Sequence, residues 1–186
     1  MQNEIELLKQ LITEHFSKSS TENTQLGLSW YERAHNECVL LSQVFELELS
    51  KVVGVVSALS PNNKWQQNLK DAWKFLDEPH IKTKVCTFKA QRQKALDILN
   101  SSGSDEVVLK ILSGDKTKNF YQNILYYKDS QAVTVDTWAY RSVGLKQSKK
   151  NFRITELAYK EVAQELNLQP HQVQAVVWGV VRGNAS

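Results

Sequence analysis

Residues 109–120 read LKILSGDKTKNF, and the fold prediction starts from this stretch. Apolar residues with helical spacing lie on both sides of Gly114 and Asp115. Glycine next to aspartate favours a tight turn. The stretch therefore predicts a helix, a two-residue hairpin and a second helix. Such a hairpin turns backbone N–H groups and a helix N-terminus outward, an arrangement that suits a phosphate oxygen.

Helical periodicity continues on both sides of this stretch and predicts about ten short helices. Residues 52–59 are apolar nearly all round and predict a central helix. The polar residues 19–27 predict a loop, and KQSKKNFR at 146–153 predicts a basic loop. Residues 133–135 have some strand character but are too few to found a sheet. The predicted fold class is all-α.

Composition limits the possible functions. The 186 residues include 23 basic and 20 acidic side chains, and the net charge of +3 permits nucleic-acid binding without requiring it. No apolar run approaches the roughly 18 residues of a membrane span, and the polar start does not resemble a signal peptide, so we expect a cytoplasmic protein without membrane contact. The four histidines lack metal-ligand spacing, so no metal site is expected.

Asp136 is the first candidate for chemistry. It lies 18 positions after Lys118, in Val135-Asp-Thr-Trp138, at the expected start of a helix. There its carboxylate can cap the helix or face a cleft, and the sequence leaves both roles open.

These stretches resemble the helix-hairpin-helix (HhH-GPD) superfamily of base-excision DNA glycosylases, of the endonuclease III type. That family carries LPGVGxKTA and, further along, VDTH; the corresponding stretches here are LSGDKTKN at 112–119 and VDTW at 135–138. VVSALSPNN at 55–63 is similar to a family helix and its Asn-rich turn, and VQAVVWGVVRG at 173–183 is similar to the last core helix. The SPNN, GxKxxxFYxNI and VTVD patterns also resemble an uncharacterised phage and bacterial group.

The resemblance implies a two-lobed helical fold with an interlobe cleft. Residues 50–135 would form a central lobe that carries the hairpin. The N-terminal helices, residues 1–49, would pack with residues 136–186 as the other lobe.

The resemblance also implies roles for particular residues. Asp136 would be the catalytic carboxylate, and Lys118 the amine that forms a Schiff base with the sugar, with Lys116 as the alternative amine. The DNA-binding residues would be those on the two turns, together with the tryptophan that replaces the family's histidine: Asn62, Asn63, Lys64, Gly114, Asp115, Lys116 and Trp138.

Each of these residues also has an ordinary interpretation. The two lysines can be solvated surface charges, and the asparagines can belong to a plain turn. Lys116 replaces the hairpin's second glycine, and Cys38 and Cys86, expected to be buried, cannot hold the family's iron–sulfur cluster, so no cofactor is expected. Trp65, Trp73 and Trp178 are expected in the core.

The functional expectation is a monomeric DNA glycosylase, with or without lyase activity, that flips a damaged or modified base out of double-stranded DNA. Two alternatives stay open. One is a phage-type enzyme that acts on hypermodified bases or nucleotides. The other is a DNA-binding module without catalysis.

Overall fold

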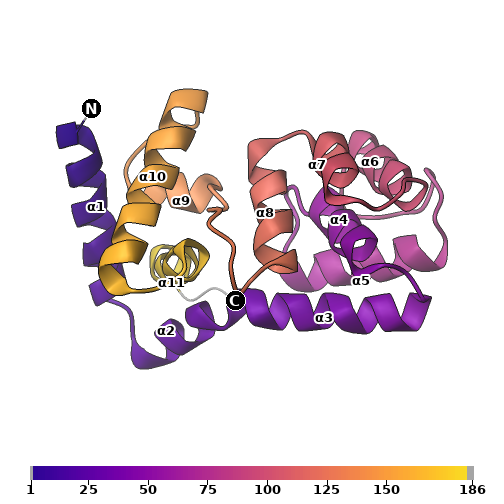
Figure 1. Ribbon diagram of the computed structural model, residues 1–186, viewed down its shortest axis with the longest axis horizontal. Coiled ribbons are helices and arrows are strands. Elements are labelled where there is room, and N and C mark those ends of the chain that lie inside the picture. Colours follow the sequence, from indigo (N-terminus) through magenta and orange to yellow (C-terminus); the bar gives the residue numbers. More distant parts are fainter. Residues whose placement is uncertain (1, 184–186) are drawn as a thin grey trace. The chain divides into compact units, whose positions relative to one another are not determined.

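The computed structural model describes residues 2–183, and all their regular structure is helical (Figure 1). No strand occurs in this part of the chain, which confirms the all-α prediction. The helices of the described residues are α1 (Gln2–Ser17), α2 (Thr21–Leu28), α3 (Trp30–Phe45), α4 (Leu49–Leu59), α5 (Trp65–Asp77), α6 (Lys89–Leu99), α7 (Asp105–Leu112), α8 (Asp115–Leu125), α9 (Thr137–Ser142), α10 (Lys149–Leu166) and α11 (Pro170–Arg182).

The chain divides into two compact units. Unit 1 comprises Met1–Arg33 and Tyr126–Ser186, and unit 2 comprises Ala34–Leu125. The first boundary between the units therefore lies inside α3, between Arg33 and Ala34, whereas the sequence predicted a boundary after Leu49. The reason is that α3 is one uninterrupted helix, most of which belongs to unit 2.

Unit 2 is built around α4. All eight residues 52–59 are buried, as the apolar sequence predicts. Helices α5, α6, α7 and α8 pack on α4. At Gly54 the side chains of Ile98 and Val108 come so close that an added Cβ would lie 2.9 Å and 3.0 Å from their methyl groups.

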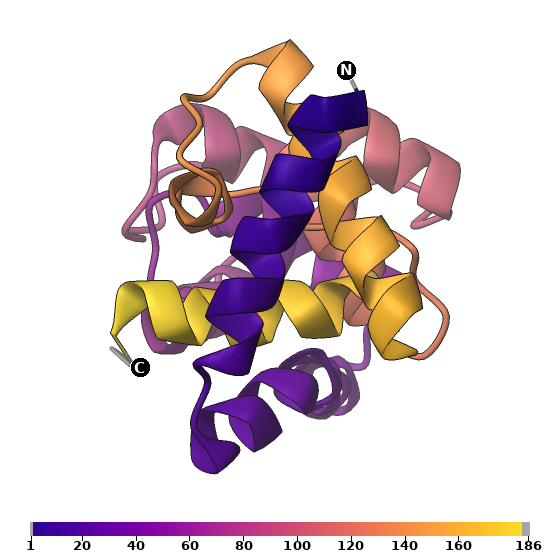
Figure 2. The same cartoon turned by 90° about the vertical axis from the view of Figure 1, so that its left-hand side faces the viewer.

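Unit 1 is built around α11, on which α1, α2, α9 and α10 pack. Figure 2 shows α1 crossing α11 and lying beside α10. The core here joins the apolar faces of α1, α10 and α11 to the irregular segment before α9, through Ile5, Leu8, Ile12, Val133, Val135, Ala158, Val162, Val173 and Val177.

Two predicted loops contain helical residues. The predicted loop 19–27 contains most of α2: Ser20 accepts a hydrogen bond from Asn23 N at 3.1 Å, and the Asn23 side chain donates to Val176 O at 3.0 Å. Packing on α11 thus stabilises a helix that its polar composition does not favour. The basic segment 146–153 is loop only at its start, because Ser148 caps α10 by accepting from Asn151 N.

Candidate nucleic-acid interface

The predicted succession of helix, turn and helix is present in unit 2, but the turn lies one residue earlier than the predicted Gly114-Asp115. Helix α7 ends at Leu112, Ser113 and Gly114 form the turn, and α8 begins at Asp115. Ser113 has a left-handed φ of 61°, and Gly114 N donates to Leu112 O at 2.7 Å. The Lys94 amine donates to Leu112 O at 2.9 Å and to Ser113 Oγ at 2.8 Å. These bonds satisfy the end of α7 and hold the turn in one conformation.

The first turn of α8 carries the hairpin lysines. Lys118 N and Thr117 Oγ1 both donate to Gly114 O at 2.9 Å. Asp115 and Lys116 are exposed, and Lys118 is half-buried. Within residues 2–183, neither lysine amine is bound to a carboxylate or a carbonyl. Both amines, next to the N-terminus of α8, are therefore available to an anionic ligand.

The two asparagines of the α4–α5 connection are used differently. Asn62 lies at the tip of the turn with a φ of 58° and an exposed side chain. Asn63 N closes the turn by donating to Ser60 O at 3.1 Å, and its side-chain amide donates to Asp71 Oδ2 at 2.8 Å. Lys64 is exposed immediately before α5. Asn62 and Lys64 thus point to solvent, whereas Asn63 anchors the turn.

Asp71 is a buried carboxylate that the sequence analysis missed. It is 1% exposed and accepts hydrogen bonds at 2.8 Å from Asn63 Nδ2, Gln67 Nε2 and Cys86 N. It joins the asparagine turn to the irregular segment 79–88. Only the helical i, i+4 spacing of Gln67 and Asp71 hinted at this role in the sequence.

Asp136 belongs to unit 1, where it caps α9. Its Oδ1 accepts hydrogen bonds from Trp138 N and Ala139 N, both at 2.9 Å. Since Oδ1 is bound to two backbone amides, Asp136 has the capping role, which is one of the two roles that the sequence left open. The side chain is partly exposed, and its negative charge contributes to raising the pKa of Tyr159, which burial raises first.

Trp138 lies among arginines. The Arg141 guanidinium carbon is 4.5 Å from the centre of the Trp138 ring and that of Arg182 is 6.0 Å from it. The sequence analysis selected Trp138 but neither arginine. The signal was available, because Arg141 follows Trp138 by three positions on one helix.

The structure thus gathers the selected residues into three groups. Gly114, Asp115, Lys116 and Lys118 lie on the hairpin of unit 2. Asn62, Asn63 and Lys64 lie on another turn of the same unit. Asp136 and Trp138 lie at the start of α9 in unit 1.

Four residues that were expected to be buried are not: Trp65 and Trp178 are half-buried, and Trp73 and Cys86 are exposed. Trp73 is 48% exposed and contacts Phe45 edge-to-face, and Cys86 is exposed. Cys38 is buried as expected, and this burial raises the pKa of its thiol to about 12.

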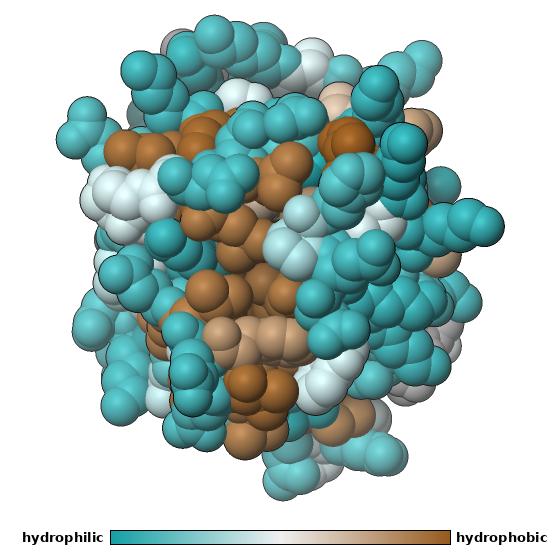
Figure 3. All heavy atoms as spheres, turned by 90° about the vertical axis from the view of Figure 1, so that its right-hand side faces the viewer, coloured by the Kyte–Doolittle hydropathy of each residue, from teal (hydrophilic) through white to brown (hydrophobic). Residues whose placement is uncertain are grey.

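Figure 3 shows apolar side chains gathered in a band on one face. In unit 2 a groove between α3 and α5 has a largely apolar lining that includes Leu40, Leu41, Leu69 and Trp73.

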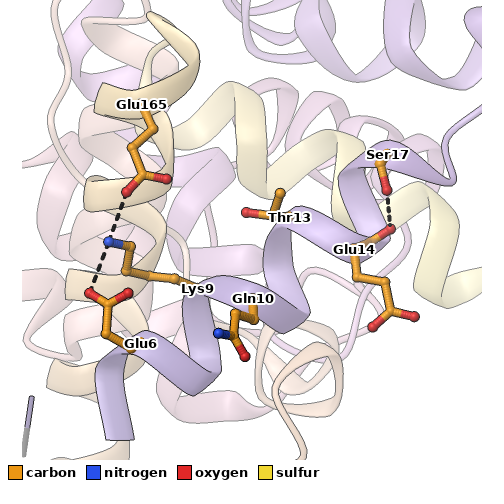
Figure 4. A pocket seen from close by; sticks show the side chains of 7 residues that line it. All are labelled: Glu6, Lys9, Gln10, Thr13, Glu14, Ser17 and Glu165. Carbon is orange, nitrogen blue, oxygen red and sulfur yellow. Dashed lines mark hydrogen bonds and ion pairs between the residues drawn. The ribbon is translucent and has the colours of Figure 1, made fainter. Parts of the chain in front are cut away.

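A hollow between α1 and α10 is polar instead. The Lys9 amine lies between Glu6 and Glu165, at 3.1 Å and 2.8 Å, and contacts Glu161 at 3.3 Å (Figure 4). The hydrogen bonds with Glu165 and Glu6 raise the pKa of Lys9 above its usual value. The one cation of this cluster, Lys9, faces the three glutamates Glu6, Glu161 and Glu165, so the cluster is net negative and lacks the unpaired cations of the hairpin.

Clusters that could bind a metal ion and helices that could span a membrane are both absent from the described residues. In the described part of the chain, no group of three or more His, Cys, Asp or Glu side chains could hold a metal ion. No helix among residues 2–183 is long and apolar enough for a membrane span.

Comparison with known proteins places the chain in a family. No curated protein and no solved structure matches it. One family model matches residues 2–185, nearly the whole sequence. The chain therefore belongs to the family of unknown function DUF7178.

Proposed function

We propose that this protein binds duplex DNA and excises a damaged or modified base. The observation that supports the proposal best is the hairpin of unit 2, whose turn is fixed by Lys94 while the amines of Lys116 and Lys118 are unpaired. The backbone amides of this turn and the Lys116 cation suit a phosphate oxygen, which leaves the Lys118 amine for the sugar. The hairpin precedes Asp136 in the chain, at a spacing similar to that in the glycosylases that the sequence resembles.

The proposed reaction assigns a step to each of two residues. The Lys118 amine forms a bond to C1′ of the sugar as the bond from C1′ to the base nitrogen breaks. The electron pair leaves with the base, which takes up one proton of the amine. The C1′–O4′ bond then breaks, O4′ takes up the second proton, and the nitrogen of Lys118 and C1′ form the C=N bond of an imine. To Asp136 the resemblance assigns a carboxylate's usual role in such enzymes, which is to stabilise the positive charge that develops on a sugar as its base departs.

Borohydride trapping tests this chemistry. The protein is incubated with duplexes that contain an abasic site, a damaged base or a hypermodified base, and borohydride reduces any imine to a stable adduct. We expect an adduct that Lys118→Gln abolishes and Lys110→Gln preserves, since Lys110 is an exposed lysine on α7. An adduct that survives Lys118→Gln but not Lys116→Gln would move the nucleophile to Lys116.

Asp136→Asn tests the carboxylate. Asparagine caps helices about as well as aspartate, so the variant should fold while base release falls by about two orders of magnitude. Unchanged base release would contradict the catalytic role of Asp136.

A second candidate function is DNA binding without catalysis. The specific observation in its favour is the capping of α9 by Asp136 Oδ1, a structural role that needs no catalytic one. Salt-dependent duplex binding, with neither adduct nor base release on any of the three duplexes, would support this candidate and contradict the glycosylase proposal.

A further inference from the structure

Unit 1 carries an alternating row of arginine and tryptophan side chains, which we call the Arg–Trp ladder: Arg141, Trp138, Arg182 and Trp178. The Arg141 guanidinium lies 4.5 Å from the Trp138 ring centre. Arg182 lies 4.7 Å from the Trp178 ring centre and 6.0 Å from that of Trp138. One arginine therefore contacts both indoles, and one indole contacts both arginines.

Two packed helices build this ladder. Trp138 and Arg141 are three positions apart on α9, and Trp178 and Arg182 are four positions apart on α11, so each pair shares one helix face. Helices α9 and α11 pack against each other. The ladder is therefore attached to the core of unit 1 and does not depend on a loop.

The charges of the ladder are not balanced locally. Neither Arg141 nor Arg182 forms an ion pair with any carboxylate of residues 2–183. Arginine stays protonated at all physiological pH values. A guanidinium carries five N–H donors in a planar fork that matches a phosphate group, and contact with one aromatic ring does not use all of them.

We propose that the Arg–Trp ladder binds the phosphodiester backbone of nucleic acid. This surface in unit 1 is additional to the hairpin of unit 2, and it rests on the proposed function only for the choice of duplex DNA. Two guanidinium groups on one indole can contact neighbouring phosphates of one strand, which repeat every 3.4 Å or so along the duplex axis.

The same geometry argues against two other anionic ligands. A lipid surface is bound by aromatic rings that enter the headgroup region, whereas Trp138 and Trp178 are half-buried and carry guanidinium groups over their rings. A single inorganic phosphate releases far fewer counterions on binding than a duplex does, so it binds the two guanidinium groups much more weakly. A polymer of phosphates uses the whole row.

Tryptophan fluorescence gives a direct test, because a phosphate that binds the guanidinium groups changes the surroundings of both indoles. Titration of the full chain with a short DNA duplex should change the emission. Arg141→Gln/Arg182→Gln should weaken duplex binding at least about tenfold. Lys18→Gln/Lys128→Gln removes the same charge from exposed positions of unit 1, including a lysine 5.7 Å from one tyrosine ring, and should have a much smaller effect.

A second variant separates planar stacking from charge. Arg141→Lys/Arg182→Lys keeps both charges but loses the planar fork, so duplex binding should weaken while its salt dependence stays the same. If the glutamine variant does not fold, the lysine variant still tests whether the two guanidinium groups bind the duplex. Equal weakening by the glutamine and control variants, or full affinity of the lysine variant, would overturn the proposal.

Two further titrations identify the ligand. Inorganic phosphate at the same phosphate concentration, and vesicles of phosphatidylserine and phosphatidylcholine, should leave the emission unchanged. A response to either that equals or exceeds the response to DNA would overturn the assignment to nucleic acid. Failure of the ladder would leave the borohydride adduct of Lys118 intact, so the two proposals fail separately.

Discussion

Each unit is built around one central helix, but the two helices bury different kinds of side chain. In unit 2, α4 buries eight successive residues, of which only Ser57 has a polar side chain. In unit 1, α11 buries His171 and Gln174 among its valines and alanines. His171 Nε2 is bonded to Tyr127 O at 2.7 Å, while its Nδ1 is buried without a partner. The stability of unit 1 should therefore depend on pH through His171, whereas the buried residues of α4 should add no pH dependence.

The largest expected effect concerns close packing on the two central helices. An added Cβ at Gly27 would lie 2.7 Å from the backbone N and Cα of Val176 on α11, and backbone cannot yield locally. We expect Gly27→Ala to lower the free energy of unfolding by about 3 kcal/mol. In Gly54→Ala the new methyl group meets only side-chain methyls, so the cost should be about 1 kcal/mol, partly offset by helix propensity.

Urea unfolding of the two alanine variants measures the difference. Equal destabilisation would contradict the distinction between a backbone contact in unit 1 and a side-chain contact in unit 2.

The next effect is the pH dependence of unit 1. Burial lowers the pKa of His171 from 6.5 to about 4, because the charged ring loses its hydration. The unfolded chain therefore takes up this proton first as the pH falls. The contribution of neutral His171 to stability is complete above pH 6.5 and is lost progressively between 6.5 and 4. Between pH 7 and pH 5 the loss should be about 2 kcal/mol.

The measurement is the free energy of unfolding at pH 7 and pH 5. His171→Gln keeps a donor for Tyr127 O and should reduce the difference between the two values by about 2 kcal/mol. His80→Gln, at an exposed position of unit 2, should leave it unchanged. An equal pH response in wild type and His171→Gln would show that another group is responsible.

A smaller effect separates the two asparagines of unit 2. Asn63→Ala leaves the buried Asp71 carboxylate with one donor fewer and should cost about 2 kcal/mol. Asn62→Gly suits the φ of 58° and should change stability by less than about 0.5 kcal/mol. If Asn62 contacts DNA, this second variant should weaken duplex binding without loss of stability. The opposite ranking in thermal unfolding would contradict the assigned roles.

The sequence predicted those elements whose signals are local. The bounds of α6, the proline start of α11 and the capping of α9 by Asp136 all follow from residues within one or two turns. Helix α2 was missed because its stability comes from the contacts of Asn23 and Gly27 with α11, more than 140 positions away. No local pattern reports such a contact.

Side-chain exposure was harder to predict than helix position. Trp73 and Cys86 are residue types that are usually buried, yet both are exposed here. In the candidate site the sequence indicated the hairpin and its lysines. The hydrogen bonds of Asn63 with Asp71 and the stacking of Arg182 across two tryptophans depend on tertiary packing, so they could not be predicted.

The most direct test of the account is the salt dependence of duplex binding. We expect the logarithm of the binding constant to fall linearly with the logarithm of the salt concentration. In Lys116→Gln the slope should become shallower by about 1, since each lost phosphate contact contributes about 0.9, and Lys118→Gln, at the proposed nucleophile, should change it less. Lys82→Gln/Lys84→Gln, at exposed positions of unit 2, should keep the wild-type slope. Binding that does not depend on salt, or a slope that the hairpin substitutions leave unchanged, would contradict the account.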